Sequence, residues 1–148
     1  MMKSKYVNIE HPTILIDGVR FDNLLNDLYK DGHFLGLIPM MTDWINLRDE
    51  AAFVLRRFES SQKKIILPIL MCPDDCDLSC TIVVTEVIIG EDEVVWNRIG
   101  IDSSNVGIPY NYELIGTTVD WLPGFPKMTF DKDEYYEKLR EIYRPINE

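Results

Sequence analysis

The sequence is short of three things: long apolar runs, cysteine, and positive charge in its central part. It has no run of about 18 apolar residues, so we expect no membrane-spanning segment. Residues 1–6 are basic and no apolar core follows them, so we expect no signal peptide and a cytoplasmic location. Cysteine occurs three times, and this odd number disfavours a disulfide framework of the secreted kind.

Signatures of common catalytic sites are absent as well. The sequence contains no Gly-x-Ser-x-Gly elbow, no glycine-rich phosphate loop and no His-Glu-x-x-His pair. His11 and His33 both fall in expected loops, without a matching nucleophile motif. We therefore expect a protein that is not an enzyme and needs no cofactor. Catalysis by carboxylates alone leaves little trace in a sequence and stays an alternative.

The residues that are present predict one globular domain spanning residues 1–148. The chain is 46% hydrophobic and 11% aromatic, which is enough for a core. Three β-rich runs, Ile65–Cys72, Cys80–Ile89 and Val94–Ile101, predict an antiparallel meander with a tight turn at Gly90–Glu93. The middle run is apolar on both faces, so we expect a central strand that is covered on both sides.

Further strands are expected on either side of the meander. Thr117–Leu122 is typical of an edge strand, and Thr13–Phe21 predicts two short strands around an Asp-Gly turn. Glu86 interrupts one apolar face of the central run. Either this residue lies near the end of the strand, or it is a buried carboxylate with a partner.

Helical periodicity predicts about three helices. The first spans Asn23–Lys30 with Asp22 as its cap, and the third runs from Asp131 to about Tyr143 with a capping box and a Phe130–Tyr135 staple. The second is capped by Asp43 or Asn46 and ends near Lys63-Lys64. It directs Ala51, Ala52, Val54, Leu55 and Phe58 inward and Arg56, Arg57 and Glu59 outward. The predicted fold class is α+β, an antiparallel meander of three to five strands packed with about three helices.

Charge is distributed unevenly along the chain. Residues 65–126 hold ten acidic residues and one basic residue, so −9 of the formal net charge of −10 falls on the predicted sheet. Such a surface repels nucleic acid and anionic lipid, so we expect neither nucleic acid nor membrane as a partner. It attracts a basic protein, or it serves only to keep the protein soluble.

Two acidic turns are the candidate partner-binding patches. In a meander they lie at opposite ends of the sheet, about 17–20 Å apart, so they are alternatives rather than one surface. Tyrosines in the loop after the third predicted strand are candidate anchors, because aromatic side chains dominate binding hot spots. Trp121 and Phe125 are expected to fill the core beneath the last helix. The candidates are Asp74, Asp75 and Asp77 in one turn, Glu91, Asp92 and Glu93 in the other, and Tyr110 and Tyr112.

Cys72, Cys76 and Cys80 form a C-x3-C-x3-C pattern. Zinc ribbons use paired C-x2-C knuckles, and no fourth ligand is near in sequence. We therefore expect no metal. Cys72 and Cys80 are expected to pack at strand ends, with Cys76 in the turn between them. A small metal- or thiol-dependent enzyme centred on these residues is the alternative function, and an uncharacterised housekeeping domain is another.

Four segments together resemble a group of bacterial proteins. They are Ile69–Cys80, Val95–Gly100, Val119–Leu122 and Phe130–Tyr135, within residues 65–143. The pattern is similar to that of small acidic immunity proteins, which neutralise a toxin delivered by a neighbouring cell. The resemblance implies a cognate toxin as partner, and a toxin that targets nucleic acid is expected to be basic because its substrate is a polyanion.

Overall fold

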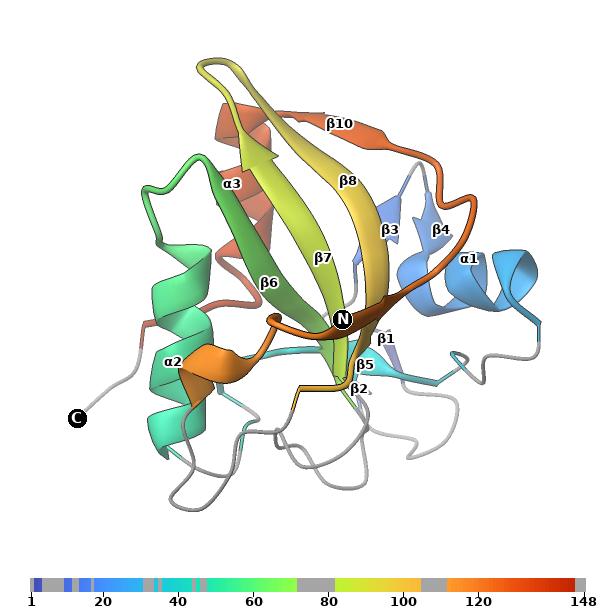
Figure 1. Ribbon diagram of the computed structural model, residues 1–148, viewed down its shortest axis with the longest axis horizontal. Coiled ribbons are helices and arrows are strands. Elements are labelled where there is room, and N and C mark those ends of the chain that lie inside the picture. The colour runs from blue at the N-terminus through green and yellow to red at the C-terminus, as the bar shows by residue number, and fades with distance from the viewer. Residues whose placement is uncertain are drawn as a thin grey trace.

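The fold is α+β, as the sequence predicts. Three α-helices accompany an antiparallel sheet of six strands among the described residues, in the order β10–β8–β7–β6–β5 with β9 also paired to β8 (Figure 1). The computed structural model describes residues 2–3, 10–11, 14–16, 18–30, 34, 36–43, 45, 48–71, 82–104 and 112–145.

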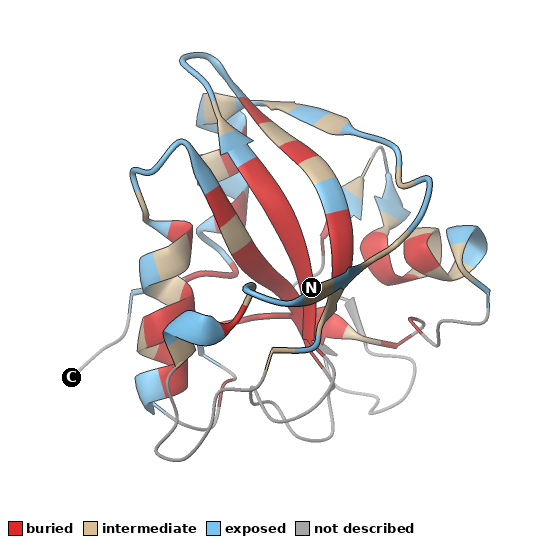
Figure 2. Cartoon of the chain, viewed as in Figure 1, coloured by how far each residue is buried: buried red, intermediate tan, exposed pale blue. Residues whose placement is uncertain are grey.

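The predicted meander is confirmed. It comprises β6 (Lys64–Met71), β7 (Ile82–Ile89) and β8 (Glu93–Asp102), each antiparallel to the next. β7 is central and buried from Ile82 to Val87, as its two apolar faces predict (Figure 2). The Gly90 N–H donates to the Glu93 carbonyl across 2.8 Å and closes the tight turn between β7 and β8.

Two short strands share the outer edge of β8. The predicted edge strand is β9 (Val119–Trp121), which pairs with the end of β8. The other, β10 (Met128–Asp131), was not predicted and pairs with the beginning of β8. β9 lies so close to Gly100 that a Cβ there would stand 2.6 Å from the Asp120 carbonyl oxygen. Glycine is therefore required at this crossing.

The opposite edge of the sheet is covered mainly by side chains. β5 (Ile38–Pro39) pairs only with Leu70 and Met71 of β6. Further along, the Arg57 guanidinium donates to the Ile66 carbonyl at 2.7 Å, and the Tyr143 hydroxyl donates to the Pro68 carbonyl at 2.7 Å. These contacts protect β6 from pairing with another chain.

The first helix, α1 (Phe21–Leu28), begins two residues earlier than predicted. Asp22 is not its cap. This residue is buried in the first turn, where its carboxylate accepts the Gly36 N–H at 2.9 Å and pairs with Arg20. The carboxylate therefore holds Gly36 beside the helix, and Leu28 in the last turn is 44% exposed.

The second helix, α2 (Arg48–Phe58), ends well before the two lysines that were expected to close it. Ala51, Val54 and Phe58 are buried as predicted, but the prediction for Arg57 was wrong. Its side chain is 17% exposed and turns under the helix toward the sheet. Figure 1 shows α2 along the β6 side of the sheet.

The third helix, α3 (Lys132–Leu139), has the predicted cap. An Asp131 carboxylate oxygen accepts the Glu134 N–H at 3.0 Å, and the Phe130 and Tyr135 rings lie 5.6 Å apart. The α-helix ends at Leu139 rather than near Tyr143. Tyr135 and Leu139 of the helix and Ile142 beyond its end are buried.

Two small sheets lie near the N-terminus. β1 (Met2–Lys3) pairs with β2 (Glu10–His11), which places His11 in a strand and not in the expected loop. β3 (Leu15–Ile16) pairs with β4 (Val19–Arg20), as predicted. Gly18 between these two strands has a φ of 82°, a conformation that glycine adopts readily.

The expectation that Trp121 fills the core is wrong. This ring is half-buried on β9, and the Arg98 guanidinium carbon lies 3.9 Å from its centroid. Phe125 is also half-buried and packs against the edge of the core. Among the described residues, no helix is long and apolar enough to cross a membrane.

Candidate binding surface at the acidic end of the sheet

The predicted candidates fall into three groups. Glu91, Asp92 and Glu93 are exposed on the β7–β8 turn. Tyr112 begins a single 3-10 turn, η1 (Tyr112–Leu114), and its ring lies 6.1 Å from that of Phe53 on α2. This position is remote from the acidic turn (Figure 1). The other candidates, Asp74, Asp75, Asp77, Tyr110 and the three cysteines, lie outside the described residues.

Pairing of β8 with β10 brings a second acidic segment to the β7–β8 turn. Asp131 stands directly opposite Glu93 in the register. The Lys132 N–H donates to the Asp92 carbonyl at 3.0 Å, and the Lys132 ammonium donates to the Gly90 carbonyl at 3.0 Å. The first turn of α3 thereby joins the turn to form one surface. We name it the acidic end: Glu91, Asp92, Glu93, Asp131, Asp133 and Glu134.

The acidic end sets six carboxylates against the one ammonium group of Lys132. Like charges directly opposite each other on paired strands are destabilising, as for Glu93 and Asp131. The positive end of the α3 dipole offsets part of that repulsion for the carboxylates in its first turn. All six carboxylates belong to exposed residues, so the remaining field reaches solvent.

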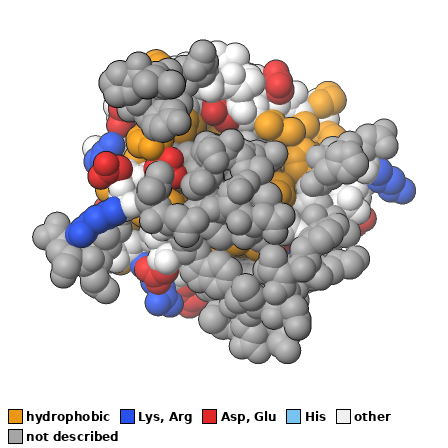
Figure 3. All heavy atoms as spheres, turned by 90° about the horizontal axis from the view of Figure 1, so that it is seen from below, with side chains coloured by type: hydrophobic (Ala, Val, Ile, Leu, Met, Phe, Trp, Pro, Cys, Tyr) orange, Lys and Arg blue, Asp and Glu red, His pale blue; other side chains and the backbone are white. Residues whose placement is uncertain are grey.

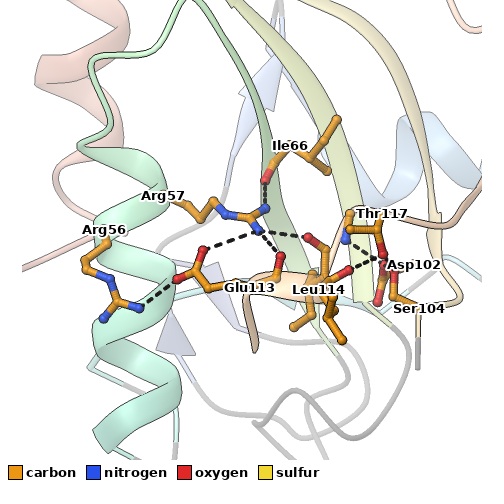
Figure 4. Close-up of polar contacts among 10 residues, drawn as sticks. Arg56, Arg57, Ile66, Asp102, Ser104, Glu113, Leu114 and Thr117 are labelled. Atoms are coloured by element: carbon orange, nitrogen blue, oxygen red, sulfur yellow. Dashed lines mark hydrogen bonds and ion pairs between the residues drawn. The ribbon is translucent and has the colours of Figure 1, made fainter. Parts of the chain in front are cut away.

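Other carboxylates of the acidic central segment are engaged within the fold. Glu113 pairs with Arg56 at 3.0 Å, and its backbone carbonyl accepts from Arg57 (Figure 4). Asp102 accepts the Ser104 hydroxyl at 2.8 Å and the Gly116 N–H at 2.9 Å. Basic side chains of α2 thus neutralise part of the predicted acidity. The negative field is therefore narrower than the charge count along the sequence indicates.

The cavity between α2, η1 and β6 has a volume of about 390 Å³ and is lined by Arg56 and Arg57. Both guanidinium groups are already engaged, Arg56 by Glu113 and Arg57 by three backbone carbonyls. Burial lowers the pKa of Arg57, and the carboxylates of Glu113 and Asp102 oppose this shift. The network holds η1 against α2, so we assign it a structural role.

Glu86 is a buried carboxylate with partners, the second of the two predicted alternatives. A bulge leaves Asn97 as an extra residue on β8, so Asn97 and Arg98 both reach Glu86, at 2.9 Å for each closest contact. Burial alone raises the pKa of Glu86. The hydrogen bonds from Asn97 and Arg98 and the charges of Arg98 and Lys64 outweigh burial, so that the pKa lies below its ordinary value.

Arg98→Met is expected to lower the free energy of unfolding by about 2 kcal/mol at neutral pH, because it leaves the Glu86 charge without its main partner. This loss is smaller than that expected for breaking a fully buried ion pair, because the Arg98 side chain is 46% exposed. The stability contributed by the depressed pKa is present above the unfolded-state pKa and is lost as pH falls through the folded-state value. Urea titrations at pH 7 and below pH 4 should therefore show the difference between variant and wild type shrinking in acid.

The matched control is the same Arg98 substitution in a Glu86→Gln background. Without the carboxylate, Arg98→Met should have a much smaller effect at neutral pH. An equal loss of stability in both backgrounds would assign the effect to packing of Arg98 on Trp121 instead of to the ion pair.

A groove opens beside the acidic end, between the beginning of β3 on one side and β10 and α3 on the other. Its volume is about 290 Å³. Ile14, Trp96, Tyr135 and Leu139 form its buried floor. The Trp96 indole N–H donates to the Tyr135 hydroxyl at 3.1 Å. Burial raises the pKa of Tyr135 far above its ordinary value, so this floor stays uncharged.

The described side chains at the opposite end of the molecule carry charges of both signs. Figure 3 views it from below, away from the β7–β8 turn. Among the described side chains drawn there, acidic and basic groups lie beside one another at the left and lower margins. Hydrophobic side chains gather at the upper right.

Sequence reasoning identified half of the acidic end. It missed Asp131, Asp133 and Glu134 as surface residues because it assigned them only to the start of a helix. The alternation of apolar and polar residues in Met128–Asp131 could have indicated a strand here, and this segment pairs with β8. Within the described ranges, no group of three or more His, Cys, Asp or Glu residues is arranged to hold a metal ion. Comparison with protein-family models, curated proteins and solved structures found no match.

Proposed function

We propose that this protein is an immunity-type inhibitor, which binds and neutralises a basic bacterial toxin through its acidic end. The observation that carries the proposal is the joining of two acidic segments, the β7–β8 turn and the first turn of α3, into one exposed surface. A surface with a large excess of one charge accelerates association with an oppositely charged protein and selects against other partners.

The chemistry of the partner follows from the same argument. A toxin that cleaves nucleic acid carries a basic surface, since its substrate is a polyanion. A carboxylate-rich protein surface competes with nucleic acid for that basic surface. Inhibition then requires neither catalysis nor a cofactor from this chain, only a rigid display of carboxylates. The hydrogen bonds between Lys132 and the β7–β8 turn contribute such rigidity.

Neutralising the turn with Glu91→Gln, Asp92→Asn and Glu93→Gln together is expected to lower the association rate with the toxin about tenfold at low salt. The probe is the product of the gene directly upstream of the gene for this chain, and stopped-flow or surface-plasmon measurements give the rate. The difference between wild type and variant should shrink at high ionic strength, because salt screens exposed charges.

The matched control is Asp27→Asn, Glu59→Gln and Asp120→Asn, a triple variant with the same change in net charge at exposed positions outside the acidic end. Its association rate should stay close to that of wild type. If both triple variants associate equally slowly, net charge alone acts and the acidic end is not a binding site. If wild type binds no toxin and gives no protection against it, the proposed function is wrong.

A further inference from the structure

The groove beside the acidic end has a form suited to a single side chain. Its volume of about 290 Å³ is below the roughly 300–1,000 Å³ of small-molecule sites. The floor is apolar and uncharged. One wall carries Leu15, which lines the groove and is 53% exposed. A large apolar side chain left in this position gains from contact with a partner.

The opposite rim of the groove is acidic. Asp131 and Glu134 line it from β10 and the first turn of α3, and Glu93 stands opposite Asp131 on β8. One Asp131 oxygen accepts the Glu134 N–H. Lys138 lies one turn after Glu134. It is the one basic residue among the described residues that line the groove. The carboxylates outnumber it, so the mouth of the groove attracts a cation.

An apolar floor below a carboxylate rim matches the two parts of a long basic side chain. The methylene stem of a lysine or arginine covers apolar surface while its charged head stays at a polar edge. Here the stem would lie along Leu15 and the floor, and the head would reach Asp131 and Glu134. The half-buried Phe130 ring also lines the groove and favours a cation near its face.

We propose that this groove receives one lysine or arginine side chain of the toxin, as the anchor of the complex that the acidic end attracts. The inference rests on the proposed function and extends it, because it assigns different roles to neighbouring parts of the surface. The β7–β8 turn acts through the field and sets the association rate. The groove acts through contact and sets the dissociation rate.

Two variants test the groove with the same toxin. Thr129→Trp fills it, since Thr129 is exposed on β10 and lines it, and leaves every carboxylate in place. Glu134→Gln removes one rim charge and leaves the Asp131 cap intact. Each is expected to raise the dissociation rate about tenfold and to change the association rate much less. Thr118→Trp is the matched control, because Thr118 is exposed and does not line the groove.

The partner side is tested by alanine substitution of each lysine and arginine on the toxin surface. One of them should show a tenfold effect that disappears when this chain carries Glu134→Gln. If wild type binds the toxin while Thr129→Trp and Glu134→Gln dissociate at the wild-type rate, the groove proposal is wrong and the proposed function stands. Absence of binding by wild type would instead end both proposals.

Discussion

Arg57→Met is expected to lower the free energy of unfolding by about 3–5 kcal/mol, one of the two largest effects we anticipate. The Arg57 guanidinium donates to the carbonyls of Ile66, Glu113 and Ile115 at 2.7, 3.1 and 2.9 Å. It also lies 4.7 Å from the centroid of the Phe53 ring. Methionine fills similar space but offers no donor, so three carbonyls lose a charged partner.

Arg56→Gln is the control for this prediction. Arg56 lies on the same helix and pairs with Glu113, but both side chains are more than 60% exposed. Such a pair contributes about 0–1 kcal/mol. Urea unfolding followed by far-UV circular dichroism measures both variants. Equal stability losses for the two substitutions would mean that the carbonyl contacts of Arg57 contribute nothing beyond a surface ion pair.

Arg57 also shows where helical periodicity stops being informative. Position along the helix predicts that this residue faces solvent, because periodicity reports only the average direction of a side chain. The residue turns inward because η1 and the free edge of β6 present carbonyls that need donors. Those carbonyls come from residues 9 to 58 positions away in the chain. No local pattern around residue 57 contains that information.

The long strands and the last helix were predictable because their signals are local. β7 is apolar on both faces, and the α3 cap requires only Asp131, Glu134 and the ring pair beside them. β10 was missed because its alternating pattern is only four residues long and runs directly into the α3 cap, so the segment was assigned to the start of a helix. Its pairing with β8 depends on long-range contact and not on its own propensity.

The same omission limited the predicted binding site. The sequence places Glu91–Glu93 in a turn, but the acids at the start of α3 lie about 40 residues later in the chain. Only the Glu93–Asp131 register shows that they share a surface. The total charge of a segment also overstated the field, because Glu86 and Glu113 have basic partners within the fold. The net charge of a segment therefore predicts the field at its surface only when the ion pairs within the fold are known.

Trp96→Ala is expected to have a second large effect, a loss of about 3–5 kcal/mol in the free energy of unfolding. Trp96 is 1% exposed, and its ring lies 5.4 Å from Phe21, 5.1 Å from Phe130 and 6.2 Å from Tyr135. The substitution leaves a cavity among three aromatic rings and removes the donor to the Tyr135 hydroxyl. Thermal and urea unfolding monitored by far-UV circular dichroism measure the loss without relying on tryptophan fluorescence.

Trp121→Ala is the matched control, because it removes the same side chain from a half-buried position on β9. Its main partner is the Arg98 guanidinium, and a cation–π contact at such a site contributes about 0.5–1 kcal/mol. The floor of the groove includes Trp96 but not Trp121. The groove proposal therefore also predicts that a Trp96 variant that stays folded releases a bound toxin faster, whereas Trp121→Ala does not. Similar losses of stability for the two tryptophans would contradict the assignment of Trp96 to the centre of the core.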